Sequence, residues 1–201
     1  MTKRLEGRTA VITGGGSGIG YATVARLADE GATVVVVDTN TASGQRVADE
    51  VSGLFIQADV TDAAQVENMY KVAFDTYGRI DIASFVASMG SATSQISYTA
   101  SKGGVLAMSR ELGVQFAREG IRVNALSPGP VNTPLLQELF AKDPERAARR
   151  LVHVPMGRFA QASEIAAAVA FLASDDSSFI TASNFLVDGG ISGAYVTPLH
   201  N

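Results

Sequence analysis

The sequence predicts an α/β fold with a doubly wound, mostly parallel sheet and helices on both of its faces. Short apolar runs rich in valine and isoleucine, such as 10–12 and 33–37, are typical of strands buried on both faces of a parallel sheet. Stretches of helical length alternate with these runs, which favours right-handed βαβ crossovers. A glycine-rich turn at 13–20 joins the first strand to the first helix. Together these observations indicate a Rossmann-like architecture.

The predicted elements follow one another along the whole chain. Strands are expected at 10–12, 33–37, 54–56, 78–82, 121–126 and 185–187, and helices at 19–30, 42–51, 63–77, 98–119 and 164–174. Gly31 and Gly120 follow two of these helices, where a glycine ends a helix. No low-complexity linker or repeat interrupts the alternation, so residues 1–201 are expected to form a single dinucleotide-binding domain.

Composition excludes several classes of protein. The chain has 201 residues, of which 46% are hydrophobic and 18% charged, which suits one globular domain. The net charge is −4 and no basic run carries interleaved aromatics, so we expect no nucleic-acid partner. Without cysteine and with two histidines, thiol chemistry is excluded and no metal site is expected. The first apolar run ends at Thr13, too short for a signal or membrane span, so we expect a cytoplasmic protein without a membrane partner.

The glycine-rich turn is a candidate phosphate site. It reads Thr13-Gly14-Gly15-Gly16-Ser17-Gly18-Ile19-Gly20, so backbone can approach a pyrophosphate at a helix N-terminus that favours anions. We therefore predict that the cofactor contacts Gly14, Ser17, Gly18, Ile19 and Gly20. A tight strand-to-helix turn also requires glycine, and the loop alone leaves that interpretation open.

Asp38 is the predicted partner of the adenosine ribose. It ends the second strand, 18 residues after Gly20, close to the spacing of about 20 at which a carboxylate meets the ribose hydroxyls. A 2′-phosphate beside this carboxylate would be repelled, and neither Ser17 nor Thr39 offers a compensating charge, so NAD is expected rather than NADP. The alternative is a solvated aspartate at a strand end.

Asp59 and Val60 follow the third strand, at the sheet edge where a ligand lies in this topology. Asp59 is expected to hydrogen-bond the adenine. Thr61 and Asp62 follow at the start of a helix, so a helix cap is an equally good interpretation of Asp59.

Tyr98 and Lys102 form a candidate acid–base pair. They are four residues apart, which places both on one face of a helix. A free phenol has a pKa of about 10, so it acts as a base near neutrality only where a cation favours the phenolate. The same spacing also occurs by chance on exposed helices.

Several motifs occur in a set order, namely Thr13-Gly14-xxx-Gly18-x-Gly20, Asp59-Val60, Tyr98-xxx-Lys102 and Pro128-Gly129. In this order they resemble the short-chain dehydrogenase/reductase family, and the similarity extends to Asn124, Gly157-Arg158 and 188–190. The resemblance implies that Tyr98 exchanges a proton with the substrate oxygen. It implies that Lys102 holds the nicotinamide ribose and lowers the tyrosine pKa. It also implies that Pro128, Gly129, Val131 and Thr133 position the nicotinamide, with Thr133 toward the carboxamide, although these residues alone indicate only a turn.

The resemblance also implies a serine that polarises the substrate carbonyl. Ser84 is our choice, at the end of what would be the fifth strand and 14 residues before Tyr98. That distance is one residue longer than usual, so Ser88 and Ser91 are the alternatives. A hydroxyl in such a loop is also a common turn former.

The chain departs from the family between Ile82 and Ala83, where a piece of roughly 30 residues or more is absent. Either a longer enzyme contains that piece, or the protein is a shortened relative. We predict an NAD-dependent oxidoreductase that transfers hydride between the nicotinamide and a secondary alcohol or ketone, 3-oxoacyl thioesters included. If the missing piece exists in a longer chain, we also expect a homo-oligomer, either a tetramer or a dimer. A catalytically impaired nucleotide-binding or scaffolding protein is the alternative. Substrate residues are expected in 135–154, a predicted mobile lid.

Overall fold

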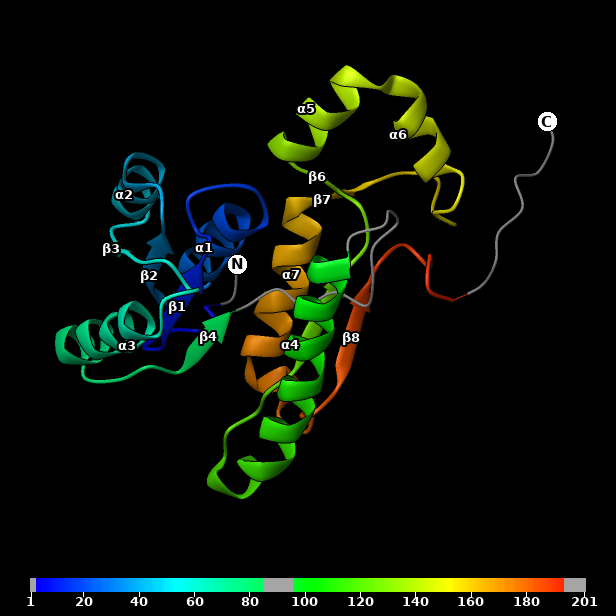
Figure 1. Cartoon of the computed structure of the whole chain (residues 1–201). Helices are drawn as coiled ribbons and strands as arrows, with labels where there is room; N and C mark the ends of the chain where they lie inside the picture. The colour runs from blue at the N-terminus through cyan, green and yellow to red at the C-terminus, as the bar shows by residue number, and fades with distance from the viewer. Residues whose placement is uncertain (1–2, 85–95, 194–201) are drawn as a thin grey trace. The chain divides into compact units, whose positions relative to one another are not determined.

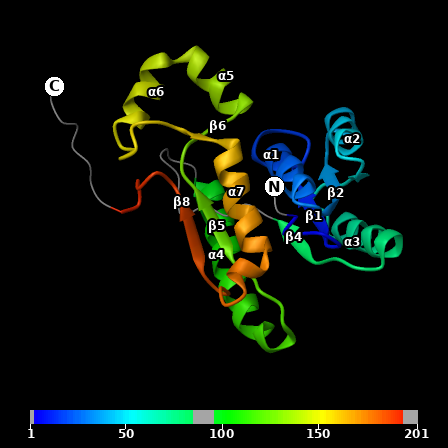
Figure 2. The same ribbon diagram turned by 180° about the vertical axis from the view of Figure 1, so that it is seen from behind.

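The computed structural model describes residues 3–84 and 96–193, and the chain divides into two compact units. Unit 1 comprises Met1–Phe85 and Ala162–Asp176, and unit 2 comprises Val86–Gln161 and Ser177–Asn201. Figure 1 labels most of the helices and strands of the two units, and Figure 2 shows the same ribbon from behind.

Unit 1 contains a four-stranded parallel sheet in the order β3-β2-β1-β4. Its strands are β1 (Thr9–Thr13), β2 (Thr33–Asp38), β3 (Leu54–Gln57) and β4 (Ile82–Ser84), and its helices are α1 (Gly18–Asp29), α2 (Thr41–Glu50), α3 (Ala63–Tyr77) and α7 (Ala162–Ala173). The short 3-10 helix η2 (Asp175–Ser177) follows α7. The predicted alternation of strand and helix is confirmed here.

Helices cover both faces of this sheet because successive strand residues point to opposite sides. One face is built from alternate residues such as Ile12 and Val36 and packs on buried side chains of α1, α2 and α7. The other face, with Val11 and Val35, packs on Met69 of α3. The valine run of β2 is therefore buried on both sides, and the predicted doubly wound architecture is confirmed.

The fourth strand begins later than the sequence predicts. Gly78 adopts a left-handed conformation with φ of 72° and donates its N–H to the carbonyl of Phe74 at 2.7 Å, so it ends α3 instead of opening a strand. The strand is Ile82–Ser84, in register with Ala10–Ile12 of β1. The prediction of a strand over 78–82 was therefore wrong in its bounds.

Unit 2 contains two pairs of parallel strands, β5 (Ala125–Pro128) with β8 (Asn184–Val187) and β6 (Val131–Asn132) with β7 (Ala160–Gln161). Its helices are α4 (Ile96–Gln115), η1 (Ala117–Glu119), α5 (Pro134–Lys142) and α6 (Pro144–Leu151). Gly120, at φ 78°, ends η1, whereas the helix predicted over 98–119 ends earlier, at Gln115.

The strand predicted over 121–126 is also shifted, to Ala125–Pro128. The residues before β5 bind the 180–183 segment through side-chain and backbone hydrogen bonds instead of through a strand ladder. Asn124 donates its side-chain amide to the carbonyl of Ile180 at 2.8 Å and accepts the N–H of Ser183 at 3.1 Å. These bonds take the place of strand pairing, which is why the apolar pattern alone misplaced the strand.

No helix in the described part of the chain is long and apolar enough to cross a membrane.

Candidate active site

The turn between β1 and α1 has a conformation that favours glycine. Gly14 and Gly18 have φ values of 65° and 55°, in the left-handed region. A Cβ at Gly20 would lie 2.0 Å from the carbonyl oxygen of Gly14, so backbone fills that space. The turn is thus a tight backbone cradle in front of the first turn of α1.

Ser17 occupies the N-cap position of α1 in an extended conformation, and its side chain makes no capping hydrogen bond. The first N–H groups of a helix lack partners within the helix and attract anions. This cradle and the uncapped first turn fit the pyrophosphate of a dinucleotide.

Asp38 lies beside this cradle. Its Oδ2 accepts the N–H of Gly16 at 2.9 Å, and its Oδ1 accepts the N–H of Asn40 at 2.9 Å. Asn40 in turn caps α2, because its side chain accepts the N–H of Ser43 at 3.0 Å. The carboxylate is thus not a freely solvated strand end but is oriented by two backbone segments.

Asp59 and Val60 lie between β3 and α3. Asp59 accepts both the N–H of Thr61 at 2.9 Å and its hydroxyl at 2.8 Å, and these bonds lower the pKa of the Asp59 carboxyl. The helix cap itself is Asp62, which accepts the N–H groups of Ala64 and Gln65. Asp59 therefore shapes the turn before the cap, Val60 is half exposed, and the predicted adenine contact stays a prediction.

Tyr98 and Lys102 lie on α4, one turn apart. The Lys102 Nζ is 5.9 Å from the centre of the Tyr98 ring, and the Tyr98 side chain is 44% exposed. Ser101 donates its hydroxyl to the carbonyl of Tyr98 at 2.8 Å. The helix therefore brings the ammonium and the phenol to one side, as predicted from their spacing.

The loop after β5 packs against the segment after β8. Gly129 donates its N–H to the carbonyl of Val187 at 3.0 Å, and a Cβ at Gly129 would lie 2.7 Å from the Cα of Asp188. Thr133 is the N-cap of α5 and accepts the N–H of Leu136 at 3.3 Å. Pro128, the last residue of β5, and Val131, in β6, connect these two anchor points.

Asp188 organises the turn that Gly129 contacts. Its carboxylate accepts the N–H groups of Gly190 at 2.9 Å and Ser192 at 3.0 Å. Although burial opposes it, these bonds hold the pKa of Asp188 below its usual value. The carbonyl of Gly189 also accepts the N–H of Met156 at 3.2 Å, so the segment after α6 joins the same assembly.

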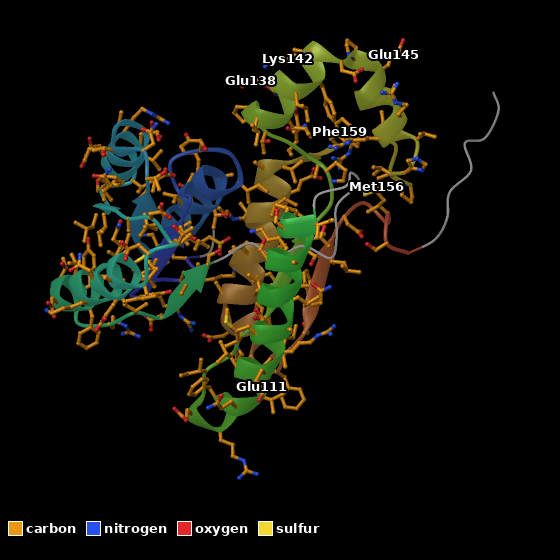
Figure 3. The ribbon with its side chains drawn as sticks, in the orientation of Figure 1. Glu111, Glu138, Lys142, Glu145, Met156 and Phe159 are labelled. Atoms are coloured by element: carbon orange, nitrogen blue, oxygen red, sulfur yellow. The ribbon has the colours of Figure 1, made fainter. Side chains whose placement is uncertain are left out.

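The α5–α6 segment carries an aromatic pair. Phe140 of α5 and Phe159 stack with ring centres 5.3 Å apart, and the Arg150 guanidinium lies 5.8 Å from the Phe140 ring. Figure 3 labels Phe159 and Met156 on the segment that follows α6. The expected lid region is therefore two short helices held by aromatic contacts.

Ser84 does not occupy the position expected for it. It is the last residue of β4, opposite Ile12, and its carbonyl accepts the Thr13 hydroxyl at 3.1 Å. The prediction of a fifth-strand end was wrong, because Ala83 and Ser84 continue the fourth strand next to β1. The alternatives Ser88 and Ser91 lie outside the described residues.

Sequence reasoning missed three residues around Asp38, namely Gly16, Asn40 and Ser43. Gly16 appears in the sequence analysis only as part of the glycine-rich turn and is not among the expected cofactor contacts, and neither Asn40 nor Ser43 is singled out there. An asparagine just before a helix, as Asn40 is, is a capping signal that the sequence does contain. The bond from Gly16 to Asp38 joins residues 22 apart and has no signal in sequence.

Within residues 3–84 and 96–193, no cluster of three or more His, Cys, Asp or Glu side chains is arranged to hold a metal ion. A backbone cradle at a helix N-terminus, an oriented acid at the end of β2 and a Tyr–Lys pair instead define a dinucleotide-binding α/β protein.

Comparison with known proteins identifies the family. A family model described as short chain dehydrogenase matches residues 8–93, and one described as enoyl-(acyl carrier protein) reductase matches residues 82–192. Levodione reductase from Leifsonia aquatica is 33% identical over 96% of this chain and 97% of that protein. The chain belongs to the short-chain dehydrogenase/reductase family, oxidoreductases that use nicotinamide dinucleotides.

Other relatives agree with this assignment. The 3-oxoacyl-(acyl-carrier-protein) reductase FabG of Thermotoga maritima is 30% identical over 94% of this chain and 99% of its own. The crystal structure of levodione reductase has a TM-score of 0.85 at 32% identity and covers 96% of this chain and 100% of that one. The crystal structure of gox2181 has a TM-score of 0.88 at 27% identity, covering 94% and 97%.

The relatives contain additional residues within the aligned region. The alignment with levodione reductase has 260 positions, whereas 96% of this chain is about 193 residues, so about 67 positions face no residue of this chain. The alignment with FabG has 246 positions against about 189 residues, which leaves about 57.

Proposed function

We propose that the protein is an NAD(H)-dependent oxidoreductase that interconverts a secondary alcohol and a ketone. The observation that carries the cofactor preference is the Asp38 carboxylate, held beside the glycine cradle by two backbone N–H groups. A carboxylate there accepts hydrogen bonds from ribose hydroxyls and repels a 2′-phosphate. NADP is the weaker ligand on this basis.

We assign the remaining cofactor contacts from the family motifs. Gly14, Ser17, Gly18, Ile19 and Gly20 would receive the pyrophosphate, and Asp59 and Val60 the adenine. Thr133 would donate its hydroxyl to the nicotinamide carboxamide. Its oxygen accepts the Leu136 N–H, which leaves the hydroxyl proton for donation. Pro128, Gly129 and Val131 fix the loop that carries it.

Tyr98 and Lys102 would carry the proton chemistry. The bound dinucleotide supplies or accepts hydride. The Tyr98 hydroxyl gives a proton to the ketone oxygen or takes one from the alcohol. The Lys102 ammonium favours the phenolate by its charge and binds the nicotinamide ribose. Ser84, or Ser88 or Ser91 in its place, would hydrogen-bond the substrate oxygen.

The substrate panel follows from the relatives. Levodione reductase, L-fucose dehydrogenase from Mus musculus and FabG are named for levodione, L-fucose and 3-oxoacyl-(acyl-carrier-protein). Levodione, L-fucose and a 3-oxoacyl thioester are therefore tested with NADH or NAD and with NADPH or NADP, following absorbance of the reduced nicotinamide. Turnover with the unphosphorylated cofactor supports the proposal, and stronger binding of NADPH in calorimetric titration contradicts it.

A catalytically impaired relative is the second candidate. It is favoured by the position of Ser84 in β4, which leaves the place of the family's fifth strand unfilled among the described residues. Such a protein would bind NADH in calorimetry but turn over none of the panel.

We also propose a cytoplasmic homo-oligomer. Apolar side chains of α4 are exposed, with Ile96 at 86%, Met108 at 55% and Val114 at 71%, and a second copy would cover them. Light scattering coupled to size-exclusion chromatography gives the mass, and a monomer at micromolar concentration would contradict this.

A further inference from the structure

The carboxylate of Asp38 is already half satisfied by backbone. A carboxylate offers about four lone pairs on two oxygens, and here one lone pair of each oxygen is occupied, by Gly16 N–H and by Asn40 N–H at 2.9 Å each. One acceptor site per oxygen is left. That number equals the two hydroxyls of an unphosphorylated adenosine ribose.

Gly16 differs from the other glycines of the loop. Gly14 and Gly18 need glycine for their positive φ values, whereas the φ of Gly16 lies outside the left-handed region. An alanine could therefore adopt the backbone of Gly16. A side chain does not fit there for lack of space, because a Cβ would lie 2.9 Å from Asp38 Oδ2 and 2.6 Å from Ser43 Oγ.

The two neighbours of that Cβ can respond differently. The Ser43 hydroxyl ends a short side chain with a 3.4 Å contact to the carbonyl of Asn40, so it can rotate away at small cost. Asp38 is bound on both oxygens, and moving it lengthens its hydrogen bonds to two backbone segments. A Cβ at position 16 therefore displaces the carboxylate that would meet the ribose.

We propose that Gly16 is the positioning residue for Asp38, and that the absence of a side chain at position 16 fixes the carboxylate for an unphosphorylated adenosine ribose. The inference rests on the proposed NAD preference and deepens it. The selectivity between NAD and NADP then depends on both residues. The Asp38 carboxylate carries the charge, and the missing side chain at Gly16 fixes the position of that carboxylate.

The test measures Kd values for NADH and NADPH by calorimetry in the full-length protein. Gly16→Ala should raise the Kd for NADH about tenfold, as expected for about 1.4 kcal/mol of lost charge-assisted hydrogen bonding, and should leave the Kd for NADPH within about twofold. Asp38→Ala should also bring the Kd values for NADH and NADPH closer together. In the Asp38→Ala background, Gly16→Ala should no longer change the ratio of the two Kd values.

Two controls distinguish displacement of the Asp38 carboxylate from general damage to the glycine-rich turn. Ser43→Ala should bind both dinucleotides like the unmodified protein, and the double variant with Gly16→Ala should still show the tenfold loss. Gly103→Ala, where a Cβ meets nothing within 4 Å on α4, should change neither Kd. Restoration of NADH binding by Ser43→Ala would assign the effect to Ser43 and overturn the proposal.

A second measurement does not depend on the Gly16 variant folding. Amide hydrogen exchange of Gly16 and Asn40 should accelerate at least about tenfold in Asp38→Ala, because both N–H groups lose their acceptor. The inference is overturned if the amide exchange rate of Gly16 is unchanged in Asp38→Ala. It is also overturned if Gly16→Ala weakens the binding of NADH and NADPH equally, whether or not Asp38 is present. An unmodified protein that prefers NADPH would instead refute the proposed function, so the two failures are distinct.

Discussion

Replacing Glu30 by glutamine should destabilise unit 1 markedly, because this buried carboxylate joins three segments. Arg4 donates to both of its oxygens at 2.8 Å each, and Arg26 donates to Oε1 at 2.6 Å. Arg4 also reaches Asp176 at 3.0 Å, and the carbonyl of Glu30 accepts the N–H of Leu5 at 2.9 Å. Glu30 thereby connects the N-terminal segment and the end of α1 to the chain after α7.

The size of the effect follows from burial. The Glu30 side chain is 3% exposed, whereas Arg4 and Arg26 are 29% and 34% exposed and can be partly hydrated once the carboxylate is gone. Breaking a fully buried pair costs about 3–5 kcal/mol, so partial exposure of the arginines brings our expectation to about 2–3 kcal/mol. For a chain of this length that lowers Tm by roughly 5–10 °C.

The effect should also depend on pH in a defined direction. Burial raises the pKa of Glu30, but the hydrogen bonds from Arg4 and Arg26 outweigh it and leave the pKa below its ordinary value. A depressed pKa in the folded state contributes stability that is complete above the ordinary value of about 4.3 and is lost as pH falls through the folded pKa. The difference in free energy of unfolding between the unmodified protein and Glu30→Gln should therefore shrink in acid.

Urea unfolding of both proteins at pH 7 and at about pH 3 tests this. Glu50→Gln is the matched control, because Glu50 forms an exposed i,i+4 pair with Arg46 and should cost less than about 0.5 kcal/mol. The prediction is contradicted if Glu30→Gln lowers the free energy of unfolding no more than Glu50→Gln does. It is also contradicted if the difference between Glu30→Gln and the unmodified protein widens in acid.

Three further outcomes are expected. Tyr98→Phe should lower kcat by at least about 100-fold while the Kd for NADH changes less than about twofold, since only the transferable proton is removed; substantial residual turnover would assign the proton to another group. Gly129→Ala should cost about 1–3 kcal/mol in thermal unfolding, because its Cβ would lie 2.7 Å from the backbone of Asp188. Asn124→Ala should cost about 1–3 kcal/mol by losing its bonds to Ile180 and Ser183, and an unchanged urea midpoint would show that those bonds are dispensable.

The sequence predicts the local parts of this fold because periodicity and caps are local signals. The valine run of β2 requires burial on two faces, and the glycine turn before α1 marks the first crossover. Strand bounds fail where tertiary hydrogen bonds decide. Nothing in the apolar residues near 121 shows that the Asn124 side chain takes over the pairing of the 180–183 segment.

The candidate site divides in the same way. The spacing of Tyr98 and Lys102 gives their shared helix face directly, because one helical turn separates them. The role of Gly16 depends on a contact with Asp38 that only the βαβ crossover creates. Ser84 was misplaced because motif spacing counts residues, whereas strand pairing with β1 decides which strand they join.

A missing segment, which the sequence predicts between Ile82 and Ala83, would account for the separate sheets. The predicted junction was wrong in its place, because Ile82, Ala83 and Ser84 form one strand, so such a segment would follow Ser84. The relatives have about 57 to 67 more aligned positions, enough for a βαβ crossover of roughly 30 residues and a further helix. Without it, β4 is the edge of one sheet and β5 pairs only with β8 in the described residues. Grafting the corresponding segment of levodione reductase after Ser84, the last residue of β4, should raise Tm and turnover together, because it supplies a strand for the β4 edge and its covering helix. A graft that binds NADH but gains neither would contradict this prediction and favour the impaired relative.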